Sequence, residues 1–347
     1  MSKFLNILDL NYIELSGWLS DQGETAFRPG QIWDWIYRKS VRDFSGMTDL
    51  PAKLRQNLSA YFILGRPIAA QKFHSSDGTV KFLFAWPDGE SVETALIPAG
   101  KRSTVCVSNQ AGCKFGCQFC ASGQPGFRRD LTAGEIIAQV LEANGTLPDR
   151  PVSHIVFMGM GEPLDNYDQV IKAARILNDR RGMNIAARRI TISTCGIVPG
   201  IMRLADEGLQ FELAVSLHAS DDGLRDQLMP VNRRYPLNAL LTACRAYCQK
   251  TNRQITFEYL LIKDLTCTSL AARQLARLFQ GIIAKMNLIA YNPVVGFSYQ
   301  TPEAAEVRMF QQELKRRGVH ATLRASRGRD MPAACGQLRG GRLISAF

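Results

Sequence analysis

The chain has 347 residues, 46% of them hydrophobic, which is enough for a large packed core. Its 42 Lys and Arg against 31 Asp and Glu give a formal net charge of +11, which favours a polyanionic partner such as nucleic acid. No stretch is long and apolar enough to span a bilayer, and Asp9 and Glu14 stand where a signal peptide would be apolar. With nine cysteines and no export signal, we expect a cytoplasmic protein with reduced thiols and no membrane partner.

Residues 1–98 are predicted to form a small N-terminal helical domain that ends in a β-hairpin. Helices are expected over 11–19, 31–40 and 49–58, and in the second Ile32, Trp35 and Ile36 share one face. Strands 80–86 and 91–97 flank a Pro-Asp-Gly turn, with Glu93 on the second strand. Either a solvated face or an RNA-contacting face explains the basic residues on these helices: Arg28, Arg38, Lys39, Arg42, Lys53 and Arg55.

From residue 99 to residue 347, strands and helices alternate. Strands are predicted over 103–108, 153–158, 189–193, 212–217, 255–262, 287–291 and 319–323. Helices are predicted over 132–143, 169–178, 201–207, 237–250, 269–279 and 302–317. Such alternation implies a parallel sheet, so the predicted fold class is α/β, with a complete or partial (β/α) barrel as the second domain.

Three cysteines, Cys113, Cys117 and Cys120, lie within eight residues in a Gly-containing loop after the first of these strands. Thiolates packed so closely suit a soft metal or an iron–sulfur cluster better than a disulfide. A closed zinc site needs four ligands, and no fourth Cys or His follows at finger-like spacing. A [4Fe–4S] cluster on three thiolates would leave one iron open to a substrate. The alternative is a zinc-dependent RNA-binding protein without enzymatic activity, with a distant fourth ligand.

Small and polar residues stand at the ends of several other predicted strands. Gly161 and Glu162 follow one strand, Ser193 ends the next, Ser216 and His218 follow a third, and Asn292 follows a later one. Singly, each has a plainer explanation, such as a tight turn or a hydrogen-bonded loop histidine. Because chemistry in a (β/α) barrel gathers where strands end, together they predict a pocket for a polar cofactor.

These motifs resemble the RlmN/Cfr family of radical S-adenosylmethionine (SAM) RNA methyltransferases over nearly the whole chain. The resemblance rests on Cys113-x3-Cys117-x2-Cys120, Gly-Met-Gly-Glu-Pro at 159–163, Ser-Leu-His at 216–218, Tyr-Asn-Pro at 291–293 and Ala-Ala-Cys-Gly-Gln-Leu at 333–338. It implies a partial (β/α) barrel of radical SAM type. By position, it implies that the three motif cysteines hold a [4Fe–4S] cluster, and that SAM contacts Gly161, Glu162, Ser193, Ser216, Leu217, His218 and Asn292.

The resemblance also implies a reaction. Cys335 would be methylated by one SAM, and a second SAM would be cleaved to a radical that activates this methyl group. Glu93 would accept the proton of the adenine ring, and Cys106 would release the product by forming a disulfide with Cys335. The implied substrate is C2 of an adenosine in the peptidyl transferase centre of 23S rRNA, on a protein-poor precursor, and in some bacteria a tRNA adenosine. The Cfr-type alternative is C8 methylation, which confers antibiotic resistance.

The resemblance further implies an electron donor such as flavodoxin and no obligate protein partner. The chain departs from the family pattern at Met331-Pro332, where the family usually has Ile-Asp, and Cys195 is an additional thiol beside the predicted pocket. Three arginines near Cys335, at 324, 327 and 329, are predicted to contact phosphates if the C-terminal loop serves the substrate.

Overall fold

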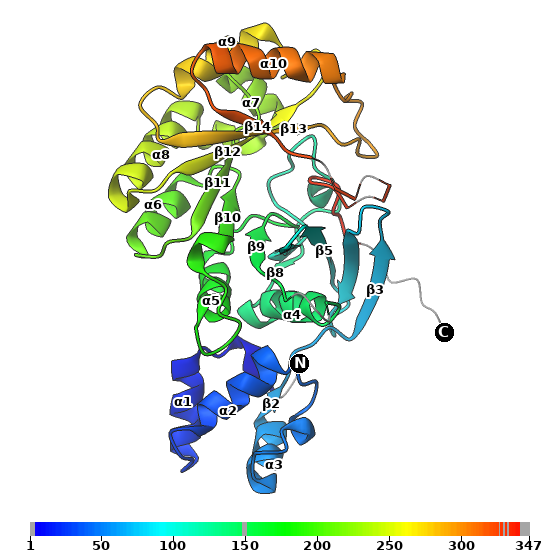
Figure 1. Cartoon of the computed structure of the whole chain (residues 1–347), viewed down its shortest axis with the longest axis vertical. Helices are drawn as coiled ribbons and strands as arrows, with labels where there is room; N and C mark the ends of the chain where they lie inside the picture. Colours follow the sequence, from blue (N-terminus) through cyan, green and yellow to red (C-terminus); the bar gives the residue numbers. More distant parts are fainter. Residues whose placement is uncertain (1–3, 148–150, 326, 329, 332, 341–347) are drawn as a thin grey trace.

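The computed structural model describes residues 4–147, 151–325, 327–328, 330–331 and 333–340, which are organised around one curved ten-stranded sheet (Figure 1). The strands lie in the order β14 (Ala321–Leu323), β13 (Ala284–Ala290), β12 (Ile255–Leu261), β11 (Glu212–Ser216), β10 (Ile190–Thr194), β9 (His154–Phe157), β6 (Arg102–Cys106), β5 (Ser91–Ala99), β4 (Val80–Ala85) and β3 (Ala69–His74). The sheet is parallel from β14 to β6 and antiparallel from β6 to β3. β14 and β3 stand at its two ends, so the predicted partial barrel is confirmed.

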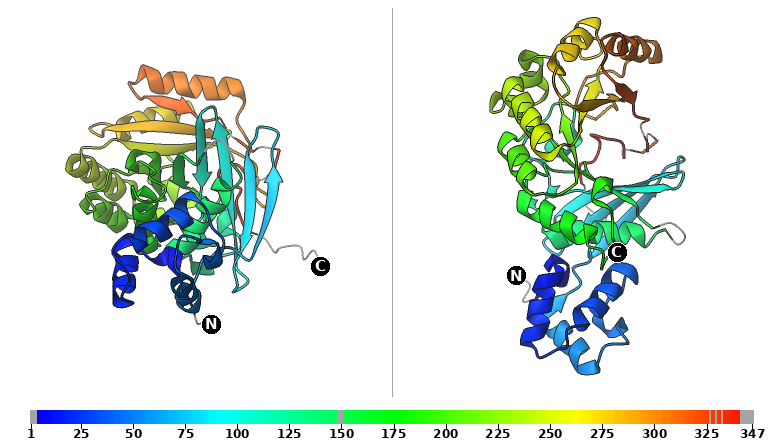
Figure 2. Two further views of the ribbon diagram at one scale, coloured as in Figure 1. Left: turned by 60° about the horizontal axis from the view of Figure 1, so that its bottom comes forward. Right: turned by 60° about the vertical axis from the view of Figure 1, so that its left-hand side comes forward.

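Helices pack on the outer, convex side of the parallel strands, and the C-terminal segment lies inside the curve (Figure 2). The outer helices are α4 (Ala133–Asn144), α5 (Tyr167–Asn178), α6 (Val198–Asp206), α7 (Asp222–Leu228), α8 (Leu237–Thr251), α9 (Ser269–Leu278) and α10 (Ala304–Arg316). The predicted capping box of α4 is present, with Thr132 and Glu135 each bonded to the other's backbone. In β12 every residue is buried, as expected of a strand covered on both faces.

The hairpin belongs to this sheet and not to the helical unit. Its second strand, β5, pairs with β6 through registers such as Ala95 with Cys106, and β3, which the sequence did not reveal, pairs with β4 on the far side. The predicted boundary between residues 98 and 99 therefore falls within β5. We propose instead that the domains divide near residue 65, where the helical unit ends.

The N-terminal unit contains α1 (Tyr12–Asp21), α2 (Arg28–Trp33), the π-helical turn η2 (Asp34–Arg38) and α3 (Ala52–Tyr61), with short 3-10 turns at Ile7–Asp9 and Phe44–Gly46. Two residue pairs, Leu5–Asn6 (β1) and Phe62–Ile63 (β2), close it as a small parallel ladder. It contacts the core where Asp9 accepts the Gly134 N–H of α4 at 2.6 Å.

The predicted helical face is confirmed in part. Ile32 and Ile36 are buried as expected, and Trp35 is partly buried against the same core while its indole N–H bonds to Asp49. Trp33 and Tyr37 are also buried. The π turn adds a residue to the helical repeat, and this rotates the side chains that follow it.

Shorter elements complete the chain. They are β7 (Gln110–Ala111), which pairs with β8 (Arg129–Asp130), and the 3-10 turns Ala121–Gly123, Ala187–Arg189 and Pro230–Arg233. Among the described residues, no helix is long and apolar enough to cross a membrane.

Candidate active site

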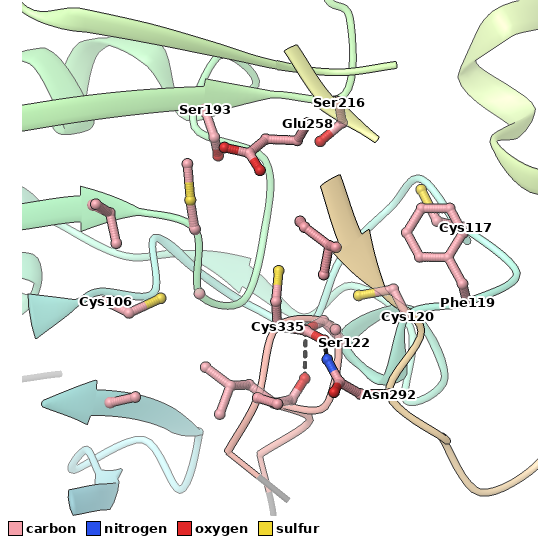
Figure 3. A pocket seen from close by; sticks show the side chains of 18 of the residues that line it. Cys106, Cys117, Phe119, Cys120, Ser122, Ser193, Ser216, Glu258, Asn292 and Cys335 are labelled. Carbon is pink, nitrogen blue, oxygen red and sulfur yellow. Dashed lines mark hydrogen bonds between the residues drawn. The ribbon is translucent and has the colours of Figure 1, made fainter. Parts of the chain in front are cut away.

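A pocket of about 430 Å³ opens inside the curve of the sheet, where the parallel strands end. It brings together the cysteines of three distant segments: the motif loop, the end of β6 at Cys106, and Cys335 near the C-terminus (Figure 3). Of the residues predicted as functional, those that line it are Cys106, Cys113, Cys117, Cys120, Gly161, Glu162, Ser193, Ser216, His218, Asn292 and Cys335. Leu217 and Glu93 are buried just outside this lining.

Backbone hydrogen bonds hold the motif loop in place. The Gln118 N–H bonds to Leu228 O at 2.9 Å, and the Ala121 N–H bonds to Gly336 O at 2.7 Å. The second bond ties the motif loop directly to the loop of Cys335, although the two are distant in sequence. Phe119, before the last motif cysteine, packs edge-on against His218 with ring centroids 4.9 Å apart.

Two glycines allow the turn after β9 to lie close to the segment that leads from β6 into the motif loop. A Cβ on Gly159 would lie 2.6 Å from Val107 O, and Gly161, at φ +95°, would place one 2.5 Å from the Gln110 Cβ. Both positions therefore require glycine. The tight turn presents Glu162, whose oxygens accept the backbone N–H groups of Cys195 at 2.6 Å and Leu164 at 3.0 Å.

Glu162 is 4% exposed, and burial raises the pKa of its carboxyl, with those backbone bonds acting in the opposite direction. This carboxyl is thus an acceptor fixed at the pocket wall. Ser193 donates its hydroxyl to Phe157 O at 2.5 Å, which leaves its oxygen lone pairs as the group available to a ligand.

His218 stands in the left-handed region at φ 54° and faces the pocket. Burial, aided by Arg225, lowers the pKa of its ring to about 3, so the imidazole is neutral at physiological pH. Its Nδ1 lies 3.1 Å from the Leu260 N–H and accepts from it. The ring proton is therefore on Nε2, which makes His218 a hydrogen-bond donor.

Sequence reasoning missed Arg225, which organises this side of the pocket from behind. It is 0% exposed and donates to the carbonyls of Cys195 at 2.7 Å, Ser216 at 3.0 Å and Leu217 at 3.1 Å, and to Asn232 Oδ1 at 2.9 Å. It thereby fastens the ends of β10 and β11 to each other. An arginine in the middle of a short polar helix gives no sequence signal for this role.

Hydrogen bonds from side chains to main-chain carbonyls hold the loop that carries Cys335. Asn292 donates to Cys335 O at 3.4 Å, Ser122 to Leu338 O at 2.5 Å, and Gln337 to Pro293 O at 2.9 Å. The thiol itself is accessible because it faces the open pocket. Burial among protein atoms raises its pKa to about 11, and the Arg324 guanidinium acts in the opposite direction.

Cys106 projects into the same pocket from β6 (Figure 3). Burial, and after it the nearby Cys335, raises the pKa of its thiol to about 12. The two sulfurs are thus close enough to influence each other, although 229 positions separate them in the sequence.

Glu93 lies at the edge of this arrangement. It points from the same face of β5 as Ala95, which lines the pocket beside Cys106. Its Oε1 is 2.8 Å from Lys81 Nζ, and its Oε2 accepts the Arg339 N–H at 2.9 Å. The sequence did not single out Lys81.

The comparisons with known proteins agree with this geometry. Residues 5–64 match the model of the ribosomal RNA large subunit methyltransferase N-terminal domain, and residues 107–267 match that of the radical SAM superfamily. Proteins named "Probable dual-specificity RNA methyltransferase RlmN" from Clostridium acetobutylicum and Geobacillus kaustophilus are 45% and 46% identical; each alignment covers 96% of this chain, and 96% and 92% of those proteins. The chain belongs to the RlmN family. The crystal structure of a radical SAM methyltransferase from Sphaerobacter thermophilus, 45% identical, matches with a TM-score of 0.93 over 96% of this chain and 99% of its own.

As a member of the RlmN family, the chain is a radical SAM RNA methyltransferase, and its superfamily uses SAM and a [4Fe–4S] cluster. The motif thiols fit such a cluster. Burial raises the pKa of all three, so each would keep its proton until a cation displaced it. Among the described residues, no three His, Cys, Asp or Glu side chains lie together as the ligands of a single ion. A four-iron cluster spreads its cysteines over separate irons.

The arginines near Cys335 have different environments. Arg324 lines the pocket, 3.6 Å from Glu258 Oε2 on β12, and its side chain is 41% exposed, so its contact with phosphate stays a prediction. Arg327 lies 4.0 Å from Asp77, and residue 329 is outside the described residues, as is Pro332 of the Met331-Pro332 departure. Cys195 lines the pocket, and burial followed by the Glu162 charge raises the pKa of its thiol well above the ordinary value, which fits an inert packing role.

Much of the predicted basic face of the N-terminal unit is engaged within the protein. Arg28 pairs with Glu24, Arg38 and Lys39 with Asp34, and Arg42 with Glu142, while Arg55 donates to Ser45 O. Most of these basic side chains therefore have a partner within the protein, as on an ordinary solvated surface. Their contact with RNA stays a prediction.

Proposed function

We propose that this RNA methyltransferase methylates C2 of an adenosine in 23S rRNA, and an adenosine of tRNA, through a methyl group carried on Cys335. The observation that carries the proposal is the convergence of Cys335 and Cys106 in one pocket with the motif cysteines. A methyltransferase that simply moved a methyl group from SAM to a nucleophile would need neither thiol.

The chemistry of the substrate explains the need for a carrier. C2 of adenine is not a nucleophilic carbon, so displacement on SAM by the base is ruled out in practice. We propose two SAM molecules per turnover, one for the methyl group and one for one-electron chemistry at the cluster, with the electron supplied by a flavodoxin-type donor.

The protein groups then have distinct tasks. Cys335 must be a thiolate to accept the methyl group, and the Arg324 guanidinium favours that form against the effect of burial. The Gly161–Glu162 turn, Ser193, Ser216, Leu217, His218 and Asn292 hold SAM, with His218 as a donor through Nε2 and Glu162 as an acceptor. Glu93 accepts the proton from the ring carbon.

Release requires the second thiol. Cys106 attacks the Cys335 sulfur, a disulfide forms, and the bond from that sulfur to the carbon on the RNA breaks. The electron pair of this bond stays with the carbon, which takes up a proton to become the methyl group. An external thiol must reduce the disulfide before the next turnover.

The test is mass spectrometry of nucleosides from a 23S rRNA fragment and from tRNA, each treated with the reduced, cluster-loaded enzyme and SAM that carries a trideuterated methyl group. We expect 2-methyladenosine with two deuterium atoms, because one is removed when the carried methyl group is activated. Three retained deuterium atoms would mean direct transfer, and 8-methyladenosine would mean Cfr-type regiochemistry; either result contradicts the proposal. Cys335→Ala is the matched inactive control.

A further inference from the structure

A buried ion pair joins Glu93 to Lys81 on the neighbouring strand. Lys81 Nζ lies 2.8 Å from Glu93 Oε1, and each residue is 6% exposed. In the β4–β5 register Lys81 faces Ala95 and Glu93 faces Leu83, so the two charged residues are diagonal neighbours on one face of the sheet. That face leads to the pocket through Ala95.

The rest of the environment restrains both side chains. The Lys81 ammonium lies 5.1 Å from the centre of the Phe73 ring, directly across from it on β3. The Glu93 carbonyl accepts the Ser108 hydroxyl at 2.5 Å, and the Glu93 N–H points to Met160 Sδ at 3.3 Å. The backbone of Glu93 is therefore held by Ser108 and Met160, and its carboxylate is held by Lys81.

The two carboxylate oxygens are not equivalent. Oε1 faces the buried ammonium, whereas Oε2 is bonded to the main-chain N–H of Arg339, four residues after Cys335. Lys81 lies inside the sheet, so it stays bound to Oε1 when substrate enters. The Arg339 N–H belongs to the loop that carries Cys335, so a substrate can replace it at Oε2.

We propose that Lys81 is a positioning residue for the proton-transfer step: it holds Oε1 of Glu93 so that Oε2 faces the adenine joined to Cys335. This inference rests on the role proposed above for Glu93. In the step, the ring C–H bond breaks, its electron pair stays with the ring, and the proton binds to Oε2. The adduct also gives up one electron, which returns to the electron donor proposed above, so that a closed-shell thioether remains for Cys106 to cleave.

Lys81 also gives the Glu93 carboxyl a charged partner at a place where water is largely excluded. A carboxylate taken out of water without any partner would be destabilised. The ammonium contacts Oε1 and leaves Oε2 to the Arg339 N–H, the partner that a substrate can replace.

The experiment compares Lys81→Met, which keeps the chain length and removes the charge, with Lys81→Arg. Single-turnover reactions use RNA deuterated at C2 of the target adenosine, and S-methyl-Cys335 formation and RNA release are measured separately. For Lys81→Met we expect ordinary S-methylation, a release step slowed about 10²-fold by misplacement of the base, accumulation of protein-linked RNA on a denaturing gel, and an increased isotope effect. Lys81→Arg should recover part of the rate.

A measurement without turnover gives independent evidence. If Lys81 holds Glu93 in place, the Arg339 amide should exchange its hydrogen faster in Lys81→Met than in the parent protein, because its acceptor has moved. The control is Arg66→Met, which removes a largely buried cation that lies 3.3 Å from Glu142 and does not line the pocket; Glu142 keeps Arg42 as a second partner. It should lower stability without changing release or Arg339 exchange.

If Lys81→Met folds poorly, the double variant Lys81→Met/Glu93→Gln provides the test. It leaves no unpaired buried charge, so it is expected to fold. If Lys81 acts through Glu93, release by the double variant equals release by Glu93→Gln alone. Parent-like release by Lys81→Met, further loss in the double variant, or equal slowing of S-methylation and release would each overturn the inference. By contrast, parent-like release by Glu93→Gln, or a parent chain that forms no 2-methyladenosine, would overturn the proposed function itself.

Discussion

Replacing Arg225 with methionine should weaken SAM binding although Arg225 does not line the pocket. Its guanidinium fastens three carbonyls, those of Cys195, Ser216 and Leu217, at the ends of β10 and β11. These strand ends carry Ser193, Ser216 and His218. Without the arginine, the segments that follow these paired strands, from Cys195 and from Leu217, lose their common anchor.

The magnitude follows from the contacts. Three buried carbonyls would each lose a charged hydrogen-bond donor, and each loss lowers the free energy of unfolding by about 1 kcal/mol or more. Removal of the buried charge itself offsets part of this cost. We expect a net loss near 3 kcal/mol, which lowers the melting temperature of a 347-residue chain by about 4 °C. Misplacement of one cofactor hydrogen bond would weaken SAM binding about tenfold.

The assay is calorimetric titration of the cluster-loaded protein with SAM, alongside thermal unfolding with and without SAM. Arg253→Met is the matched control, because Arg253 pairs with Glu212 at the opposite end of β11 from the pocket. That variant should be destabilised but bind SAM normally. If Arg225→Met binds SAM as tightly as the parent, or if Arg253→Met loses as much affinity, the positioning role is refuted.

Two further predictions concern the cluster and the RNA. Cys117→Ala should lose most of the iron and all SAM cleavage, whereas Cys195→Ala, in the same pocket, should keep both; iron analysis and deoxyadenosine measurement check this, and near-full iron with retained cleavage in Cys117→Ala would disprove the ligand assignment. RNA binding should weaken steeply with salt because the +11 chain releases counterions at each phosphate contact; filter binding over a salt series checks this, and an affinity that does not change with salt would count against an electrostatic RNA surface.

The sequence predicted the elements whose signals are local. The parallel strands are short runs rich in apolar and β-branched residues, and the capping box marked the start of α4. Residues at strand ends were predictable because barrel topology brings such ends together whatever lies between them. For that reason the sequence could place Glu162, His218 and the motif cysteines in one pocket without knowledge of any contact.

What the sequence could not reveal depends on contacts between distant segments. The pairing of β5 with β6 decides to which domain the hairpin belongs, and no local pattern encodes it. Arg225 and Lys81 are charged residues in short elements, which would ordinarily face water. Their roles appear only when the carbonyls and the carboxylate that they contact are in place.

The central claim is that Cys335 carries the group transferred to RNA and Cys106 releases it. The most direct measurement is denaturing electrophoresis of Cys106→Ala after reaction with RNA, followed by mass spectrometry of the linked peptide. We expect a covalent protein–RNA species joined through Cys335, and its absence from Cys335→Ala and from the double variant Cys106→Ala/Cys335→Ala. Normal turnover by Cys106→Ala with no linked RNA, or the same adduct in Cys335→Ala, would contradict it.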